Sequence, residues 1–335
     1  MKIPFSKNTF GPEEEEAIIN CIRSGWVVLG PKTQEFEQKF ANYVGARYAV
    51  FVDSGTSALF LAIRAAGYKD FVTISSLTFV SDAEVVHHAG LRIEYADIDR
   101  KTLCIDSPAV QNCLPTNFAG VKARADGLVV DSCHRIERND VEHSKAMWCY
   151  SFYATKNMST VQGGMIALND KDKYEWLLKA RDHGMTKGTQ QRYQGKDPVY
   201  DVEFPGWRVK GDDFRAALGL VQLSRLPQIN ARRRYIVDRY NKNLGLDNRG
   251  NHLYPILVDK RLEFINYMHE QGVQTSIHFL PIHKFTAYKN EEVKLPVTEY
   301  VCDRIVSLPL FYDITDEEID YISEKVLASK LLIIK

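Results

Sequence analysis

The sequence predicts an α/β protein in which a large domain with a mostly parallel sheet precedes a smaller C-terminal α+β domain. Short apolar runs alternate with helical patterns through the first part of the chain, as they do in parallel sheets whose strands are joined by helices. Small hydroxylated residues, an aspartate and a lysine follow several of these runs. The regular alternation of strand and helix patterns changes after about Leu226, so we expect domains at residues 1–226 and 227–335.

Composition restricts the class of protein. The chain has 335 residues, enough for a large core and two domains, and 45% of them are hydrophobic. Lysine plus arginine and aspartate plus glutamate both number 43, and no basic block indicates binding to nucleic acid or to an anionic membrane. No apolar run suits a signal peptide or a membrane span. The six cysteines contain no C-x-x-C pair, so we expect a reduced, cytoplasmic protein without a metal site.

Two amphipathic helices are expected at the start. Pro12 and four glutamates begin the first helix, which ends at Gly25, and the second carries Phe36 and runs to Gly45. The loop between them, residues 25–31, is too apolar for a simple linker. It is either a packed loop or the lip of a pocket or subunit contact.

A strand at Tyr48–Val52 leads into a helix through a turn rich in glycine, serine and threonine. Such a turn presents backbone N–H groups and hydroxyls to an anion. An N-cap by Ser54 or Thr56 explains the same residues without a ligand. The chain has no G-x-x-x-x-G-K-[ST] and no G-x-G-x-x-G, so neither a P-loop nor a dinucleotide-binding fold is indicated.

Further strands and a helix continue the alternation. The strands are expected at 71–75, 91–96, 127–130, 147–150 and 165–168, and the helix at 81–89. Gly55, Phe79, Asp131 and Lys156 each follow the end of a predicted strand. Because ligands bind at the carboxyl ends of parallel strands, this convergence predicts a binding site.

Lys156 is the most reactive candidate, and it lies between two apolar runs among hydroxylated residues. A lysine on a loop is ordinarily solvated. Between two buried strands it is partly desolvated instead, which lowers its pKa and frees an amine able to form a Schiff base. The residues alone leave both interpretations open.

The second half of the chain is expected to be mostly helical at first. We expect a helix to about Asp182, a polar stretch at 184–202, a helix at 212–226 ended by Pro227, and a basic helix at 229–244. The polar stretch is long for a loop and is either mobile or functional. The arginine run at 232–234 is expected to be a solvated face. The C-terminal domain should hold strands at 252–258 and 273–279, helices at 261–271 and 315–332, and ordered loops at 281–283 and 307–310.

Several motifs in order resemble the DegT/StrS group of pyridoxal-phosphate-dependent sugar aminotransferases of fold type I. They are S-G-T-S-A-L from Ser54, D-S-C-H from Asp131, S-F-Y-A-T-K-N from Ser151 and R-A-A-L-G-L-V-Q-L from Arg215. The resemblance covers nearly the whole chain. It implies an aspartate-aminotransferase-like fold and pyridoxal 5'-phosphate as the cofactor, with pyridoxamine 5'-phosphate in the cycle.

The resemblance also implies three catalytic residues. Lys156 would form the Schiff base with the cofactor and later move the proton between substrate and cofactor. Asp131 would keep the pyridine nitrogen protonated, and His134 would contact the phenolic oxygen of the ring. From the residues alone, a helix-capping carboxylate is the favoured interpretation of Asp131.

Further residues would hold the cofactor by the same resemblance. Phe79 would stack on the ring, although an aromatic after a strand is more often part of the core. Gly55, Thr56, Ser57 and Ser151 would bind the phosphate.

One segment departs from the family pattern. Relatives carry G-Y-N-Y-R where this chain has Gly206-Trp207-Arg208-Val209-Lys210, and that asparagine reaches the cofactor phosphate of the neighbouring subunit. We therefore expect a homodimer with shared active sites, in which Arg208 reaches that phosphate as a charged donor. The competing interpretation is that Arg208 and Lys210 bind the carboxylate of the amino donor.

The resemblance implies transfer of an amino group from an amino acid, expected to be L-glutamate, to a nucleotide-linked 3- or 4-keto-deoxysugar. The sugar is expected to lie over residues 25–30 and 184–202. A sugar dehydratase of the same fold is one alternative, but such enzymes replace the lysine by histidine. A non-catalytic sensor that retains the fold is another, and it would need neither Lys156 nor Asp131.

Overall fold

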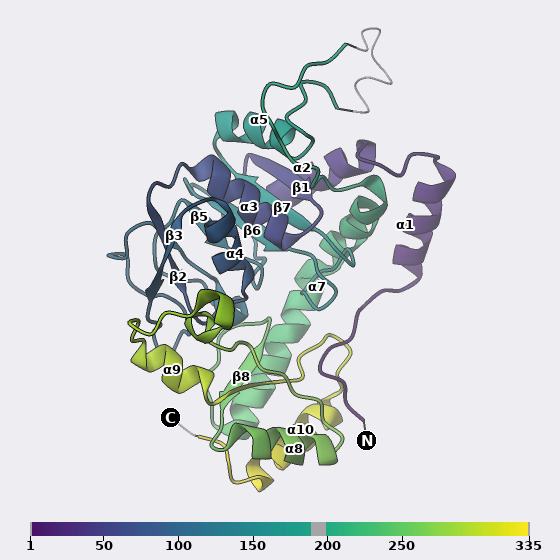
Figure 1. Ribbon diagram of the computed structural model, residues 1–335. Helices are drawn as coiled ribbons and strands as arrows, with labels where there is room; N and C mark the ends of the chain where they lie inside the picture. The colour runs from purple at the N-terminus through teal and green to yellow at the C-terminus, as the bar shows by residue number, and fades with distance from the viewer. Residues whose placement is uncertain (1, 189–198, 334–335) are drawn as a thin grey trace.

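A computed structural model describes residues 2–188 and 199–333, and its centre is a set of strands joined edge to edge (Figure 1). Strands β1 (Tyr48–Val52), β7 (Gly164–Leu168), β6 (Met147–Ser151) and β5 (Val129–Asp131) form one sheet in that order. Strands β3 (Arg92–Ala96), β2 (Phe71–Ser75) and β4 (Cys113–Leu114) form a parallel second sheet. Parallel bridges Cys113–Gly127 and Thr116–Asp131 link β4 to β5. Only β7 pairs antiparallel with its neighbours in these two sheets, so the predicted mostly parallel arrangement is confirmed.

Helices cover both faces of this central sheet because successive strand residues point to opposite sides. These helices are α2 (Pro31–Val44), α3 (Gly55–Ala66), α4 (Ser81–His88) and α5 (Lys171–Ala180), whereas α1 (Pro12–Arg23) packs on the long helix α7 (Asp213–Leu244). Val50 and Val52 of β1 share a core with residues of α3, α4 and α5. Phe51 points the other way, into an aromatic core with Phe36 and Phe40 of α2.

Helix α7 (Asp213–Leu244) connects the sheet to the C-terminal part of the molecule (Figure 1). The predicted break at Pro227 is wrong, because α7 continues through it. Proline inside a helix costs about 3 kcal/mol. Leu226 and Ile229 are buried on either side of it, and their packing offsets that cost. The domain boundary proposed at 226/227 falls inside this helix, and the division into two domains stays a prediction.

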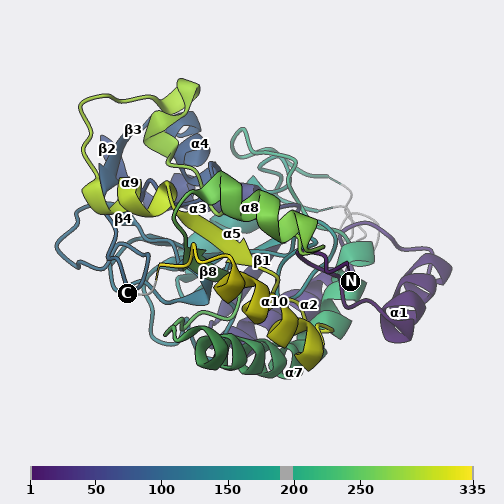
Figure 2. The same cartoon turned by 90° about the horizontal axis from the view of Figure 1, so that it is seen from below.

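The C-terminal part is built on an antiparallel pair, β8 (Tyr254–Leu257) and β9 (Ile305–Leu308). The helices are α8 (Arg261–Glu270), α9 (Pro296–Cys302) and α10 (Asp316–Ala328), with short 3-10 turns at Ile282–Lys284 and Thr286–Tyr288; a further 3-10 turn, Phe118–Gly120, lies between β4 and β5. Figure 2 shows α8 and α10 flanking β8, with α7 alongside α10. The hydrophobic core of the C-terminal part joins Ile236 and Tyr240 of α7 to Ile322 of α10, and it also includes Ile3 from the start of the chain.

Two predictions for this part were wrong. The loop expected at 307–310 begins inside β9, where the apolar pair Ile305-Val306 starts a buried strand that Pro309 follows. The strand expected at 273–279 makes only isolated bridges, one from Val273 to Ile3 and one from Ser276 to Ser307.

The polar stretch at 184–202 is described in part, since residues 189–198 lie outside the described residues. The described residues on either side of this gap pair with each other. Met185 and Val202 form an antiparallel bridge, and the Thr186 N–H donates to the Asp201 carbonyl at 2.9 Å.

Among the helices of residues 2–188 and 199–333, none is both long and apolar enough to span a bilayer.

Candidate active site

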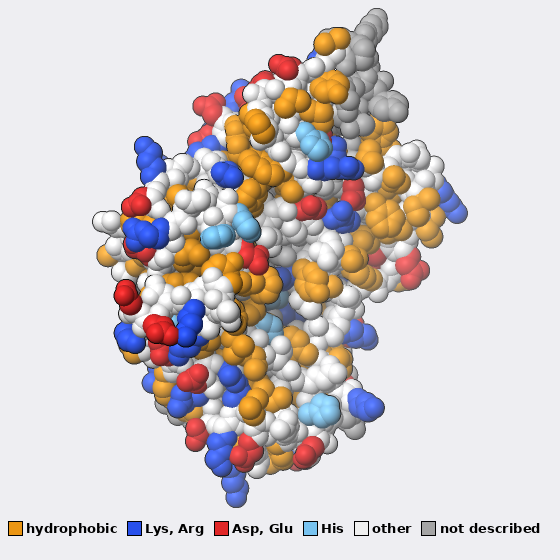
Figure 3. Space-filling model, in the orientation of Figure 1, with side chains coloured by type: hydrophobic (Ala, Val, Ile, Leu, Met, Phe, Trp, Pro, Cys, Tyr) orange, Lys and Arg blue, Asp and Glu red, His pale blue; other side chains and the backbone are white. Residues whose placement is uncertain are grey.

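A cavity of about 330 Å³ lies where β2, β5 and β6 end, between the sheet and loops of the C-terminal part. It contains seven of the nine predicted site residues: Gly55, Thr56, Phe79, Asp131, His134, Ser151 and Lys156. Ser57 and Arg208 do not line it. The face shown in Figure 3 is hollowed near its middle, with basic and histidine side chains inside the hollow.

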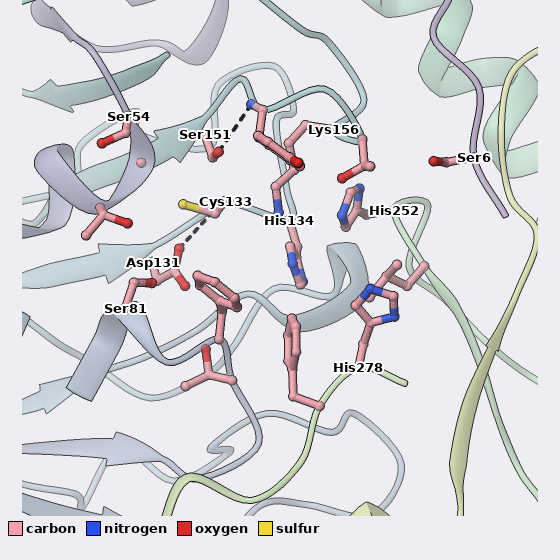
Figure 4. Close-up of a pocket in the computed structure, with 18 of the residues that line it drawn as sticks. Ser6, Ser54, Ser81, Asp131, Cys133, His134, Ser151, Lys156, His252 and His278 are labelled. Atoms are coloured by element: carbon pink, nitrogen blue, oxygen red, sulfur yellow. Dashed lines mark hydrogen bonds between the residues drawn. The ribbon is translucent and has the colours of Figure 1, made fainter. Parts of the chain in front are cut away.

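Lys156 projects its amine into this cavity (Figure 4). The ammonium makes no ion pair or side-chain hydrogen bond with the residues that the structure describes. Burial lowers the pKa of Lys156, although negative charge on Cys133 or Asp131 would oppose that shift. Lys156 is half-buried, which agrees with the partly desolvated alternative and not with a fully solvated loop lysine.

Asp131 is the last residue of β5, and 4% of it is exposed. Its Oδ1 accepts a hydrogen bond from the backbone N–H of Cys133 at 2.9 Å, the dashed line beside Asp131 in Figure 4. A turn follows it instead of a helix, so the helix-capping alternative is wrong. Burial raises the pKa of Asp131.

His134 is a neutral donor, because a backbone contact selects its tautomer. The N–H of Ala119 donates to His134 Nδ1 at 3.3 Å, so the ring proton lies on Nε2. Burial holds the pKa of His134 well below its usual range, and the charge of Lys156 adds to this effect. The ring stacks on Phe279, with centroids 5.8 Å apart.

Helix α3 brings its N-terminus to the cavity beside Ser151. Ser54 caps the helix by accepting the N–H of Ser57 at 3.1 Å, as one of the two sequence-based interpretations expected. The Ser57 hydroxyl is 2.9 Å from that of Ser54 and faces the cap instead of the cavity. The N–H groups of Gly55 and Thr56 have no partner within the helix. They remain available to an anion.

Gly55 is required by this close approach. A Cβ added at Gly55 would lie 2.8 Å from the Cβ of Ser151 and 3.1 Å from the Sγ of Cys133. Any side chain would push the N-terminus of α3 away from Ser151, so only glycine allows both to reach one anion.

Phe79 is an exposed wall of the cavity, because 54% of its surface is accessible. Its ring lies 5.9 Å from that of Phe279, which a loop of the C-terminal part supplies. The alternative that Phe79 is part of the core is wrong.

Arg208 lies outside the cavity of its own chain. Its side chain is exposed, and its backbone forms a bridge with Asp182. Lys210 pairs with that same aspartate, with Nζ and Oδ1 2.8 Å apart. The expected contact of Arg208 crosses a dimer, so it stays a prediction.

Arg233 also lines the cavity, although it is not among the site residues that the sequence predicted. Arg233 was expected on a solvated face, yet only 5% of it is exposed. Its Nε donates to the carbonyl of Asn251 at 2.7 Å, and its Nη2 to that of His252 at 2.6 Å. Helical spacing could have found it, because it falls on one face of α7 with Ile229 and Ile236.

The sequence matches the DegT/DnrJ/EryC1/StrS aminotransferase family over residues 8–121 and 128–327. The chain belongs to this family. The resemblance predicted from the motifs is confirmed, and so are the α/β aminotransferase fold and the assignment as an enzyme.

Named relatives agree with this assignment. The spore coat polysaccharide biosynthesis protein SpsC of Bacillus subtilis is 33% identical, over 97% of this chain and 96% of its own. The putative sugar aminotransferase Spr1654 of Streptococcus pneumoniae, in its PMP-form, is 26% identical with a TM-score of 0.88 and covers 98% of this chain and 100% of its own. Helicobacter pylori PseC, an aminotransferase of pseudoaminic acid biosynthesis, shares the fold at 20% identity and a TM-score of 0.87, over 98% of this chain and 99% of its own.

The cavity fits pyridoxal phosphate. The free N–H groups of α3 and the Ser151 hydroxyl suit its phosphate, and the Asp131 carboxyl suits the ring nitrogen. The Nε2–H of His134 suits the ring oxygen, and the Lys156 amine suits the aldehyde carbon. The cofactor prediction is also confirmed among solved relatives, since Spr1654 has structures in PLP and PMP forms.

Proposed function

We propose that this aminotransferase uses pyridoxal phosphate to move an amino group from an amino acid, expected to be L-glutamate, to a nucleotide-linked 3- or 4-keto-deoxysugar in the cytoplasm. The observation that carries the proposal is the desolvated amine of Lys156, which lies in one cavity with Asp131, His134 and the N-terminus of α3. The six free cysteines support a reducing compartment.

When bound, pyridoxal phosphate supplies an aldehyde that exchanges amines and a ring that accepts electrons from the adjoining carbon. Lys156 serves first as the amine that holds the cofactor, and then as the base that moves a proton at the substrate carbon. Asp131 holds the proton on the ring nitrogen, and His134 donates Nε2–H to the ring oxygen. Phe79 and Phe279 form the apolar wall that excludes water from one side.

The amino donor's carboxylate has a candidate partner in Arg233. No acidic side chain in the described part of the chain pairs with this guanidinium, and burial lowers the pKa of Arg233 to about 9. A buried cation without an anion is costly, so a carboxylate in the cavity would stabilise it. Arg233 is a better candidate than Lys210, whose charge Asp182 already neutralises.

Replacing Arg233 by glutamine should raise the KM for the amino donor by about 10- to 100-fold, the value of one charged hydrogen bond. Single-turnover kinetics with the donor alone, and separately with the keto-sugar, would measure this. A purely structural Arg233 would lower the thermal stability and slow both half-reactions alike, which would contradict the proposal. Arg249→Gln, in an exposed pair with Asp247, is the matched control.

The two alternatives are less well supported. A sugar dehydratase of this fold carries histidine in place of the lysine, and here Lys156 occupies the cavity. A non-catalytic sensor would need neither the lysine nor the buried Asp131.

Residues 25–30 and 184–188 do not line the cavity of their own chain. If the sugar contacts them, we propose that it does so at the site of a second subunit. Substituting Val27 by aspartate should then raise the KM for the sugar without changing donor kinetics. An unchanged KM would refute this placement.

We further propose a homodimer with shared sites. Exposed apolar side chains lie on α1 and the loop after it: Ile19, Ile22, Val27 and Val28. Figure 3 shows hydrophobic side chains gathered over this region. An apolar surface of this kind supports a contact with another copy of the chain, and it would bring Arg208 of one subunit toward the phosphate in the other.

Mixing two variants, each impaired in a different part of the site, would test the shared site. Arg208→Gln alone should weaken pyridoxal phosphate binding by about 10-fold or more. In a heterodimer of Arg208→Gln and Lys156→Ala subunits, one site would combine an intact Lys156 with an intact Arg208. We expect that heterodimer to regain wild-type cofactor affinity in one site. No regain, or a monomer in sedimentation experiments, would overturn the proposal.

The experiment that tests the function is the absorption spectrum of the purified protein with pyridoxal phosphate, before and after glutamate. We expect a band near the visible edge that shifts with glutamate and returns when the keto-sugar is added. A protein that takes up no pyridoxal phosphate would refute the mechanism. One that responds to glutamate but to no nucleotide keto-sugar would refute the substrate class.

A further inference from the structure

A second carboxyl group, that of Asp82, lies directly behind Asp131. Asp82 belongs to the first turn of α4 and is 0% exposed, and unlike Asp131 it does not line the cavity. Its Oδ2 accepts hydrogen bonds from the hydroxyls of Thr78 at 3.0 Å and Thr116 at 2.9 Å. Thr116 is also the bridge partner of Asp131, so this one residue joins the two buried aspartates, and the charge of Asp131 is near enough to raise the pKa of Asp82.

The other oxygen of Asp82 has no donor. Oδ1 is buried, and no N–H or O–H of the described residues reaches it. Asp131 likewise receives the backbone N–H of Cys133 on its own Oδ1. Two ionised carboxylates in contact would place only acceptors opposite each other in a buried site, which costs several kcal/mol. One proton between them removes that repulsion.

Among the residues that the structure describes, no other group near Asp82 carries a positive charge that could balance an ionised carboxylate there. Burial raises the pKa of the Cys113 thiol on β4 to about 12, and it raises the pKa of Cys149 on β6 well above its usual range. Both thiols therefore stay neutral. Cys133 and Lys156 lie on the far side, toward Asp131, and Lys156 favours the ionised form of Asp131.

We propose that Asp82 is a positioning residue, a neutral carboxylic acid whose Oδ1–H donates to Asp131 and keeps Asp131 ionised and aimed into the cavity. The role toward the cofactor rests on the proposed function. The protonation itself is a property of the chain alone and can be tested without the cofactor.

The direction of the pKa shifts agrees with this arrangement. Burial, followed by the charge of Asp131, raises the pKa of Asp82 well above its usual range. Burial also raises the pKa of Asp131, whereas the hydrogen bond from Asp82 lowers it. Both directions agree with a proton on Asp82. The alternative is an ionised Asp82 that simply stabilises the N-terminus of α4 through the helix dipole.

The test compares Asp82→Asn with the wild-type apoprotein. Asparagine is neutral and of the same size, its carbonyl can keep the bonds from Thr78 and Thr116, and its amide can donate to Asp131. The infrared difference spectrum at pH 7 should show the carbonyl band of a protonated carboxyl group in the wild type only. Absence of this band would overturn the proposal, whether or not the protein binds pyridoxal phosphate.

Stability against pH gives a second measurement on the apoprotein. A carboxyl with a raised folded pKa stabilises the fold below its unfolded pKa of about 3.9, and this stability is lost as the pH rises through the folded pKa. The wild type should therefore lose stability between pH 4 and pH 8, and Asp82→Asn should not. As a result, the Tm of Asp82→Asn minus the Tm of the wild type should be about 5 °C larger at pH 8 than at pH 4. A difference that does not vary with pH would identify Asp82 as ionised.

The positioning role is tested on the loaded protein. Asp82→Leu cannot donate, so pyridoxal phosphate affinity should fall about 10-fold, and the pH at which the bound cofactor changes colour should shift. Asp82→Asn should restore both. If the leucine and asparagine variants behave alike, the donated hydrogen bond does not act on Asp131, and the role fails even where the infrared band is present.

Discussion

Replacing Lys156 by alanine should abolish transamination, lowering kcat by at least about 10⁴-fold. The residue is proposed both to hold the cofactor and to move the proton, and a positioned acid or base alone contributes about 10²- to 10⁴-fold. Borohydride reduction followed by mass spectrometry should find the cofactor attached to Lys156 in the wild type and to no residue in the variant. The fold should survive, because the substitution removes a desolvated ammonium that no described carboxylate pairs with.

The control is Lys145→Ala, which removes an exposed lysine from the turn before β6. It should leave the rate and the spectrum at wild-type values. Residual transamination of Lys156→Ala within 10-fold of the wild type would mean that another amine does the chemistry.

Replacing Asp131 by asparagine should have the second largest effect, a fall in kcat of about 100-fold or more. Asparagine still accepts the N–H of Cys133, so the geometry is kept while the negative charge at the ring nitrogen is lost. A 100-fold loss corresponds to about 2.7 kcal/mol of transition-state stabilisation. Steady-state kinetics at saturating donor would measure it, with Asp126→Asn, an exposed aspartate ahead of β5, as the control.

The same substitution should stabilise the apoprotein at neutral pH. Since burial raises the pKa of Asp131, its contribution to stability is present below the unfolded pKa and is lost as the pH rises. The Asp131→Asn variant should therefore melt above the wild type at pH 8 and close to it at pH 4. A variant that is both slower and less stable would show that Asp131 is mainly structural.

Much of the site could be predicted because its determinants are local. Ser54 caps α3 whatever packs around it, and the strand periodicity places Asp131 and Ser151 at strand ends. Lys156 lies on the short loop that follows one of those strands, β6. Since parallel strands end at one edge of a sheet, these residues had to converge.

Other features depend on contacts that no local pattern contains. Pro227 ordinarily ends a helix, but burial of Leu226 and Ile229 carries α7 through it. Arg233 belongs to a run of three arginines whose neighbours pair with surface acids, and only the loop at Asn251 and His252 distinguishes it. The local sequence is the same for the solvated arginines and the buried one.

By itself, then, the sequence determined the order of the elements, the family and the residues at the strand ends, because periodicity and short motifs are properties of neighbouring residues. Only the tertiary structure decided the protonation and pairing of those residues. Asp82 and Asp131 are 49 residues apart along the chain, yet they share one buried space. The free energy of a buried charge depends on its surroundings in space, and those exist only once the chain has folded.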